Sequence, residues 1–265
     1  MKKTILLTND DGYSAAGLLS LYDELVKEFD VCVVAPNKEQ SWAGKSITRI
    51  PVKTAKIEIE RVNGIKCEAT PATCTQIGLY ELFSESKPDL VVSGINTGSN
   101  TGLGRALSSG TVGAAMEASL AGIPSVACSM FFPFEQVRNN KDSLETDTEH
   151  YQIAAKRCAE LISKLVNYNY PEHTDLISIN IPYKSRSDTP VRVTPIDRSH
   201  YGKLFNHHKE SGHYINDGAN PEDESPVAGS DSAVIAKGEI SITPISLELV
   251  SQAGRDALKS FLDLM

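Results

Sequence analysis

Residues able to bind a hard cation follow three separate apolar runs of the sequence. Asp10 and Asp11 are adjacent carboxylates after the first run, and Gly12 follows them. Ser41 lies in a polar loop after the second run, and Asn96 comes directly after a third. Carboxylate, hydroxyl and amide oxygens together form a set of hard ligands, which suits Mg²⁺ or Mn²⁺ better than zinc. These side chains predict a site for one divalent cation per chain, provided that the fold brings the three ends together.

The same acidic segment is also compatible with a solvated turn that caps the helix after it, because aspartate and glycine are common in turns. Two adjacent carboxylates repel each other unless a positive group lies between them. In a regular strand they would also point to opposite faces, so the chain must turn at Gly12 if both are to face one ligand. The positions of Ser41 and Asn96 favour the cation site over the simple turn.

A second group of polar residues is predicted to bind phosphate. A glycine-rich loop spans residues 97–104, and Ser109, Gly110 and Thr111 then open a helix. Free N–H groups and the helix dipole attract an anion at such a start, so we expect these residues and Asn100 to contact phosphate oxygens. An ordinary serine cap, with a contribution of about 1 kcal/mol, would use the same donors. The loop matches neither the Walker A pattern nor the dinucleotide-binding glycine pattern.

Apolar periodicity predicts the elements that position these groups. Short buried runs at residues 4–9, 31–35, 89–95, 124–130 and 176–181 indicate strands, and helical spacing is found at 18–29, 70–83, 110–121 and 153–165. A hairpin is expected at 56–69, with its turn at Asn63-Gly64. Because strands and helices alternate, we predict an α/β fold with a mostly parallel, Rossmann-like sheet covered on both faces. Ligands of such sheets bind outside the carboxyl ends of the strands, where the polar residues lie.

The pattern changes near residue 185. We predict a catalytic core at 1–184 and a C-terminal extension at 185–265 that belongs to the same domain. The extension is polar and rich in loops at 185–220, flexible at 221–232, strand-like at 233–245 and helical at 254–264. Four histidines lie in its first part, but their spacing is not tied to regular structure, so we interpret them as surface residues. Residues 131–148 are expected to form a surface excursion.

Composition limits the classes of partner. The chain has 265 residues, 40% of them apolar, and a formal charge of −8, which repels nucleic-acid polymers. A small phosphorylated substrate is still compatible with this charge, because a bound cation dominates the local field. No apolar run is long enough to span a bilayer. The five cysteines form no CxxC pair, which favours reduced thiols in the cytoplasm.

Five motifs in the right order resemble the SurE (survival protein E) family of nucleotidases. They are ILLTNDDG at 5–12, VAPNKEQSWAGKS at 34–46, VVSGIN at 91–96, SGTVGAAME at 109–117 and SITP at 241–244. The resemblance implies a three-layer α/β/α fold and hydrolysis of nucleoside 5′- and 3′-monophosphates with a divalent cation. It places the cation ligands on Asp10, Asp11, Ser41 and Asn96. It also implies that the C-terminal extension exchanges segments between subunits, in a homodimer or a homotetramer.

The chain departs from the family pattern at three places. Thr73 stands where aspartate is common, Ser108 stands where tyrosine is frequent, and Ser230-Asp231 replaces Thr-Asp. None of these positions is an expected cation ligand, so the departures bear on substrate preference and not on catalysis. Trp42, directly after Ser41, is compatible with stacking on a base and equally with covering its own loop.

The sequence leaves the catalytic step open. Asp10, with Asp11 beside it in the catalytic pair, either positions or deprotonates the attacking water or attacks phosphorus itself. A phosphatase of the haloacid-dehalogenase type is a second hypothesis, but it requires Asp-x-Asp where this chain has Asp-Asp-Gly. A non-catalytic receiver module is a third, but it requires an aspartate at the strand end that Asn96 occupies. Lys45 and Arg49 are compatible with phosphate contacts, although lone basic residues are usually only solvated.

Overall fold

A computed structural model of the protein describes residues 2–133, 148–199, 202–216 and 226–262. The short apolar runs form the centre of a nine-stranded sheet, in the order β3-β4-β2-β1-β5-β6-β7-β11-β8. Its parallel core consists of β1 (Thr4–Thr8), β2 (Asp30–Pro36), β5 (Leu90–Thr97), β6 (Ser125–Phe131) and β7 (Leu176–Pro182). The predicted parallel sheet is therefore confirmed.

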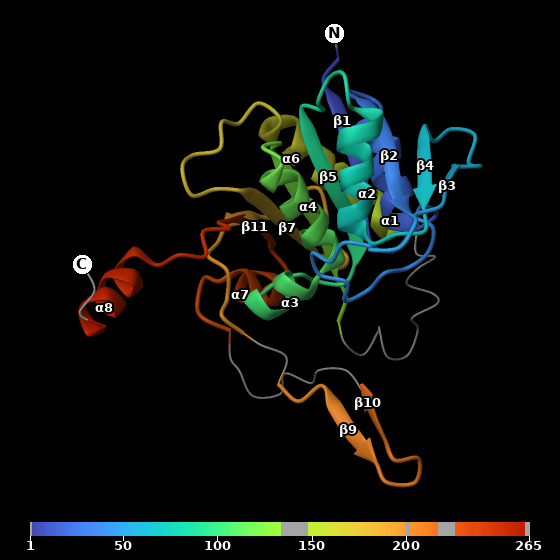
Figure 1. Cartoon of the computed structure of the whole chain (residues 1–265). Helices are drawn as coiled ribbons and strands as arrows, with labels where there is room; N and C mark the ends of the chain where they lie inside the picture. Colours follow the sequence, from blue (N-terminus) through green and yellow to red (C-terminus); the bar gives the residue numbers. More distant parts are fainter. Residues whose placement is uncertain (1, 134–147, 200–201, 217–225, 263–265) are drawn as a thin grey trace.

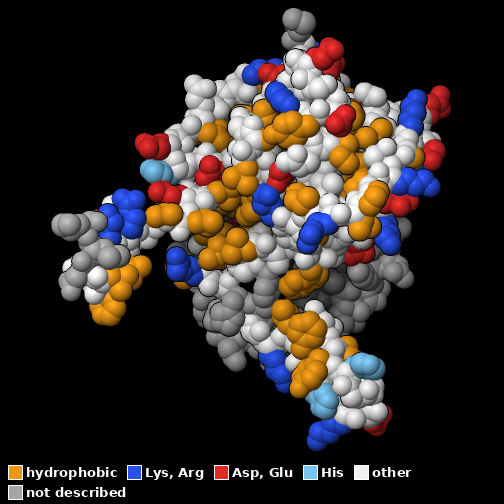
Figure 2. Space-filling view, viewed as in Figure 1, with side chains coloured by type: hydrophobic (Ala, Val, Ile, Leu, Met, Phe, Trp, Pro, Cys, Tyr) orange, Lys and Arg blue, Asp and Glu red, His pale blue; other side chains and the backbone are white. Residues whose placement is uncertain are grey.

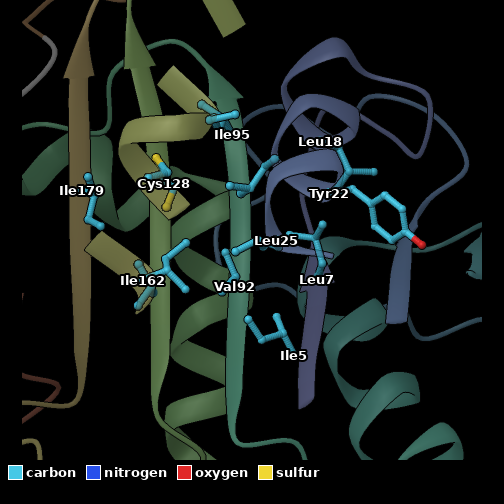
Figure 3. Packing of buried hydrophobic residues seen from close by; sticks show 14 of the residues in the cluster. Ile5, Leu7, Leu18, Tyr22, Leu25, Val92, Ile95, Cys128, Ile162 and Ile179 are labelled. Carbon is cyan, nitrogen blue, oxygen red and sulfur yellow. The ribbon is translucent and has the colours of Figure 1, made fainter. Parts of the chain in front are cut away.

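Helices cover both faces of this sheet. Helices α1 (Ala16–Leu25) and α6 (Thr148–Leu165) pack on one face, and α2 (Pro71–Ile77) and α4 (Gly110–Leu120) pack on the other (Figure 1). Successive residues of β1 point to opposite faces, so Ile5 and Leu7 join the core under α1 (Figure 3), whereas Leu6 packs in a separate cluster on the side of α2. The predicted three-layer α/β/α architecture is confirmed.

The strand order reverses between β1 and β5. From β1 the chain moves outward through β2 to β4 (Gly64–Cys67), then returns across the sheet to β5 and continues in the other direction through β6 and β7. In an open parallel sheet, the crevice at this reversal is where ligands bind. The residues directly after β1 and β5 therefore flank the expected binding position.

One edge of the sheet differs from the prediction. β3 (Thr54–Lys56) pairs antiparallel with β4, and residues 57–63 form the connection between them. Gly64 is inside β4 and not in the predicted turn. A Cβ atom at this position would lie 2.1 Å from the carbonyl oxygen of Val33, so the parallel pairing of β4 with β2 needs glycine here. This close approach moves the turn toward Ile59, whose carbonyl accepts from Val62 N–H at 2.8 Å.

The C-terminal segment completes the other edge. β11 (Ile240–Ile245) pairs antiparallel with β7, and β8 (Val191–Val193) pairs parallel with β11. Residues 231–232, predicted as flexible, and 233–236, predicted as strand-like, instead form helix α7 (Asp231–Ala236), because the Ser230 hydroxyl caps it by accepting from Ala233 N–H at 3.3 Å. Residues 221–225 of the predicted flexible stretch lie outside the described residues, as do residues 134–147 of the predicted excursion at 131–148.

Two parts of this segment extend away from the sheet. A separate hairpin of β9 (Phe205–His208) and β10 (His213–Asn216) projects below the carboxyl edge, and α8 (Gln252–Phe261) projects to one side (Figure 1). The described histidines of the C-terminal extension are exposed, as predicted: His207, His208 and His213. His200 lies outside the described residues.

Smaller features refine the remaining predictions. Helix α2 continues as a π-helical turn, η1 (Gly78–Leu82), and an unpredicted short helix, α3 (Leu103–Ser108), precedes α4. All five cysteines are free thiols. Within the described ranges, none of the helices combines the length and apolar character needed to cross a bilayer.

Candidate active site

The acidic pair lies in a sharp turn at the end of β1. Asn9 is buried and closes this turn: its side-chain amide donates to Gly12 O at 2.9 Å, and Gly12 N–H donates to Asn9 Oδ1 at 3.3 Å. Gly12 has a φ of 104°, a conformation that favours glycine. The expected turn at Gly12 is therefore present, and it carries Asp10 and Asp11 out of the strand.

Asp10 lies at the N-terminus of α4. The Thr111 hydroxyl donates to Asp10 Oδ1, and the backbone N–H of Thr111 donates to the same carboxylate. Gly110 permits this approach, because a Cβ atom there would lie 2.8 Å from Asp10 Cβ. The start of α4, which attracts anions, thus holds a carboxylate of the protein itself.

Asp11 reaches across to the end of β5. Its Oδ2 accepts from the backbone N–H of Thr97 at 2.9 Å, which places the carboxylate beside Asn96. The Asn96 amide group donates to Gly98 O at 2.7 Å, and its Oδ1 accepts no hydrogen bond from the described residues. The Asp11 carboxylate and the residue that carries this amide oxygen therefore lie at the same strand end, at the strand reversal.

Ser41 belongs to a loop, residues 37–46, that lies over the same edge. Gln40 N–H donates to Asp10 O at 2.7 Å, so the residue before Ser41 is fixed to the acidic turn. The Ser41 hydroxyl donates to Glu39 Oε1 at 2.5 Å. The structure thus brings the segments of all four expected ligands, Asp10, Asp11, Ser41 and Asn96, to the edge formed by β1 and β5.

Burial of these two carboxylates, for which the described residues supply no ion pair, disfavours their ionised forms. Burial raises the pKa of Asp11 to about 8, and the neighbouring Asp10 charge adds to this, opposed by hydrogen bonds from Thr97. Burial likewise raises the pKa of Asp10, although Thr111 donors oppose the effect. The Glu39 charge raises both pKa values further. A bound cation would reverse this balance by stabilising the charged carboxylates.

The donor chemistry fits a hard cation. The four side chains offer oxygen atoms alone, as Mg²⁺ and Mn²⁺ prefer. Over the described ranges, no group of three or more His, Cys, Asp or Glu residues has the arrangement of a metal site. A cation at the β1 and β5 ends would therefore need the neutral oxygens of Ser41 and Asn96 in addition to the two carboxylates.

The expected phosphate contacts are close to this cluster but differ in availability. Asn100 is buried, with its N–H donating to Asn180 Oδ1 at 2.9 Å and its side-chain amide donating to Ser129 Oγ at 2.7 Å. The Ser109 hydroxyl caps α4 by accepting from Val112 N–H at 3.1 Å. Gly110 N–H has no acceptor among the described residues, so it remains a donor for a bound anion.

The sequence alone does not predict several of the contacts that position these residues. Thr111 is expected to bind phosphate, whereas both of its donors are directed at Asp10. Glu39 is a further acidic group at the site. Because it lies two residues before Ser41 in the same loop, the sequence could have predicted a carboxylate near this position. Lys45 forms an ion pair with the buried Glu117 of α4 and so ties the loop to this helix instead of extending into solvent.

Fold and site together define a class: a three-layer α/β/α protein with an acidic pair at the reversal point of a mostly parallel sheet. A family model described as survival protein SurE matches residues 5–203. The chain therefore belongs to the SurE family.

Individual relatives agree with this membership. A protein of Methanoculleus marisnigri named 5′-nucleotidase SurE is 34% identical, with 100% of this chain and 99% of that protein covered. A protein of Geotalea uraniireducens with the same name is 36% identical, with 96% of this chain and 97% of that protein covered. The crystal structure of the SurE protein from Aquifex aeolicus has a TM-score of 0.79 and 31% identity, and covers 98% of this chain and 100% of that chain.

Proposed function

We propose that the protein is a phosphomonoesterase that hydrolyses nucleoside 5′-monophosphates, and also 3′-monophosphates, to nucleoside and phosphate, using one Mg²⁺ or Mn²⁺ per subunit. Family membership and the names of the full-length relatives support hydrolysis of nucleoside monophosphates. The observation that carries the proposal is the adjacent carboxylates of Asp10 and Asp11 at the strand reversal, with Asp10 buried and Asp11 half-buried, and with the segments of Ser41 and Asn96 at the same edge.

Each residue in this site has a proposed role. Asp10, Asp11, Ser41 and Asn96 would hold the cation, which supplies positive charge to the phosphate oxygens as negative charge develops on them. Gly110 N–H, at the start of α4, would donate to a further phosphate oxygen. Asn100 and Ser109 would complete the phosphate site. Thr111 would hold the Asp10 carboxylate in place through its two donors.

Two catalytic steps are compatible with the position of Asp10. In one, Asp10 orients or deprotonates the attacking water; in the other, its carboxylate attacks phosphorus and water then hydrolyses an aspartyl-phosphate. A single turnover of ³²P-labelled AMP, quenched in acid, distinguishes them. If Asp10 attacks phosphorus, the P–O bond to the nucleoside breaks and ³²P becomes bound to the protein at Asp10 before water releases it as phosphate, whereas direct attack by water leaves no protein-bound ³²P.

Phosphate release from AMP tests the proposed function directly. We expect turnover with Mn²⁺ or Mg²⁺ and its loss with excess chelator. Asp11→Asn should lower kcat/KM by at least about 100-fold, which corresponds to roughly 2.7 kcal/mol of barrier, because it removes a charged ligand. The matched control is Asp30→Asn, at an exposed aspartate of β2, which should behave as the wild type. Unchanged turnover in chelator, or in Asp11→Asn, would exclude this function.

We also propose that the protein assembles into a homodimer or homotetramer through its C-terminal extension, and that it acts in the cytoplasm on small nucleotides and not on nucleic-acid polymers or membranes. Helix α8 has no buried residues, and Leu258 and Phe261 are exposed on it. Hairpin β9–β10 likewise exposes Phe205 and Tyr214, and hydrophobic side chains are visible on both projections in Figure 2. A second copy of the chain would cover these apolar surfaces.

A further inference from the structure

Trp42 has a backbone conformation that tryptophan rarely adopts. Its φ is 62°, in the left-handed region that favours glycine, and a bulky residue there is strained. The side chain is 53% exposed, so burial of the indole does not compensate for the strain. A tryptophan that only covered its own loop would be expected to bury most of its surface. Strained backbone conformations of this kind cluster at ligand-binding and active sites.

The loop on both sides of Trp42 is fixed to the active site. Two residues before it, Gln40 N–H donates to Asp10 O at 2.7 Å; two residues after it, Gly44 N–H donates to Ser108 O at 2.9 Å. The ion pair between Lys45 and Glu117 adds a third connection, to α4. Trp42 is therefore held between the acidic turn and the start of α4 and is not on a free loop.

These fixed neighbours limit how far the Trp42 backbone can lie from the active site. Two Cα steps span at most about 7.6 Å, so the Trp42 backbone lies within that distance of the residues fixed to Asp10 and to Ser108. Leu107, whose carbonyl oxygen would lie 3.1 Å from a Cβ atom at Gly44, is also exposed. Exposed apolar surface thus borders the polar edge that carries the proposed cation site, a combination that fits a ligand with a charged end and a flat apolar end.

We propose that Trp42 is the stacking platform for the nucleobase of the substrate, and hence a specificity-determining residue that separates nucleotides from base-free phosphate esters. The inference depends on the proposed nucleotidase function and adds the group that recognises the base. Stacking uses the π-face that every base has, so the platform selects nucleotides as a class and favours purines through their larger face.

Substrate selectivity is the first test. The ratio of kcat/KM for AMP to kcat/KM for ribose 5-phosphate should fall about tenfold in Trp42→Gly, which corresponds to the lower part of the range for one stacked base. Trp42→Phe should keep most of the ratio, because it keeps an aromatic face. The thermal midpoint of Trp42→Gly should not fall, since glycine accepts this φ. Tyr168→Ala, at an exposed tyrosine beyond α6, is the matched control and should leave the ratio unchanged.

Fluorescence gives a second readout, because Trp42 is the single tryptophan of the chain. The phosphonate analogue of AMP, which is not hydrolysed, should change the emission on binding, while the phosphonate analogue of ribose 5-phosphate should not. An unchanged ratio in Trp42→Gly, together with emission that does not respond to the AMP analogue, would overturn the proposal even if the wild type hydrolyses AMP. Failure of the wild type to hydrolyse either ester would instead overturn the nucleotidase function on which the proposal depends.

Discussion

Asp10 and Asp11 are adjacent in sequence, yet their carboxylates are held by different parts of the fold. Asp10 accepts from the hydroxyl and the backbone N–H of Thr111 at the start of α4. Asp11 accepts from the backbone N–H of Thr97 at the end of β5. The backbone donor of Asp11 cannot be removed by substitution, and the Thr97 hydroxyl, which also interacts with Asp11, forms a hydrogen bond with the Tyr151 hydroxyl, so its removal would change a second contact. Thr111 is therefore the residue at which support of the acidic pair can be tested separately from the pair itself.

We expect Thr111→Val to lower kcat by about 10- to 100-fold, because a hydrogen bond to a charged group contributes roughly 1.5–3 kcal/mol. Valine keeps the shape of the side chain, and the backbone N–H remains. Thr111→Ser, which restores the hydroxyl, should recover most of the activity. Steady-state kinetics with AMP at saturating Mn²⁺ measure the effect. Wild-type kcat in the valine variant would show that Thr111 does not position Asp10.

At the scale of elements, the contact between the 37–46 loop and α4 determines where Ser41 and Trp42 lie. Gly113 faces this loop: a Cβ atom at Gly113 would lie 2.3 Å from Gly44 O. Thr70 also contributes, since its hydroxyl donates to Ser46 O at 2.6 Å instead of capping α2. The loop is thus positioned by α2 and α4 together.

We expect Gly113→Ala to reduce kcat/KM for AMP by at least about tenfold, because the added methyl group displaces the loop backbone from α4 and so moves Ser41. Alanine favours a helix over glycine by about 1 kcal/mol, so helix propensity alone would predict a stabilised and active protein. Kinetics and thermal unfolding of the same variant separate the two effects.

The matched control lies at the other end of α4. Gly122 has a φ of 78°, and a Cβ atom added there would meet no other atom within 4 Å. Gly122→Ala should lower stability by about 1 kcal/mol, since alanine is strained there, and leave kcat/KM unchanged. If Gly113→Ala kept full activity, the contact between loop and helix would not position the site.

Local patterns are sufficient to predict the central strands, because each is a short apolar run that ends at a polar group. The same patterns predict the strand ends that carry Asp10, Asp11 and Asn96. Contacts between distant segments cannot be read in this way: the position of β4 depends on the approach of Gly64 to Val33, 31 residues earlier. The direction of the Thr111 donors also depends on packing, since a serine or threonine at a helix start is compatible with several acceptors.

For the whole molecule, the C-terminal segment is connected to the site and not only to the edge of the sheet. Asp231 is buried, and its carboxylate accepts from the N–H groups of Gly102, Asp197 and Ser232, each at 2.8 Å. One of these donors belongs to the glycine-rich loop next to the proposed phosphate site. We therefore propose that residues 1–184 and 185–265 form one domain, in which the extension holds that loop in place.

The exposed apolar face of α8 leads to a prediction about assembly. We expect the double substitution Leu258→Glu and Phe261→Glu to lower the mass measured by light scattering, because burying two carboxylates at a subunit contact is unfavourable. Leu120→Glu is the matched control, since Leu120 is also exposed but lies at the end of α4, and it should keep the wild-type mass. A wild-type monomer, or an unchanged mass in the double variant, would exclude assembly through α8.

The proposed activity requires one cation held where β1 and β5 end. Anomalous diffraction at the manganese edge, from crystals soaked in Mn²⁺, would locate this ion. We expect one strong peak per subunit, within about 2.0–2.6 Å of oxygen atoms of Asp10, Asp11, Ser41 and Asn96. Absence of a peak at these residues, or a peak held by other side chains, would contradict it.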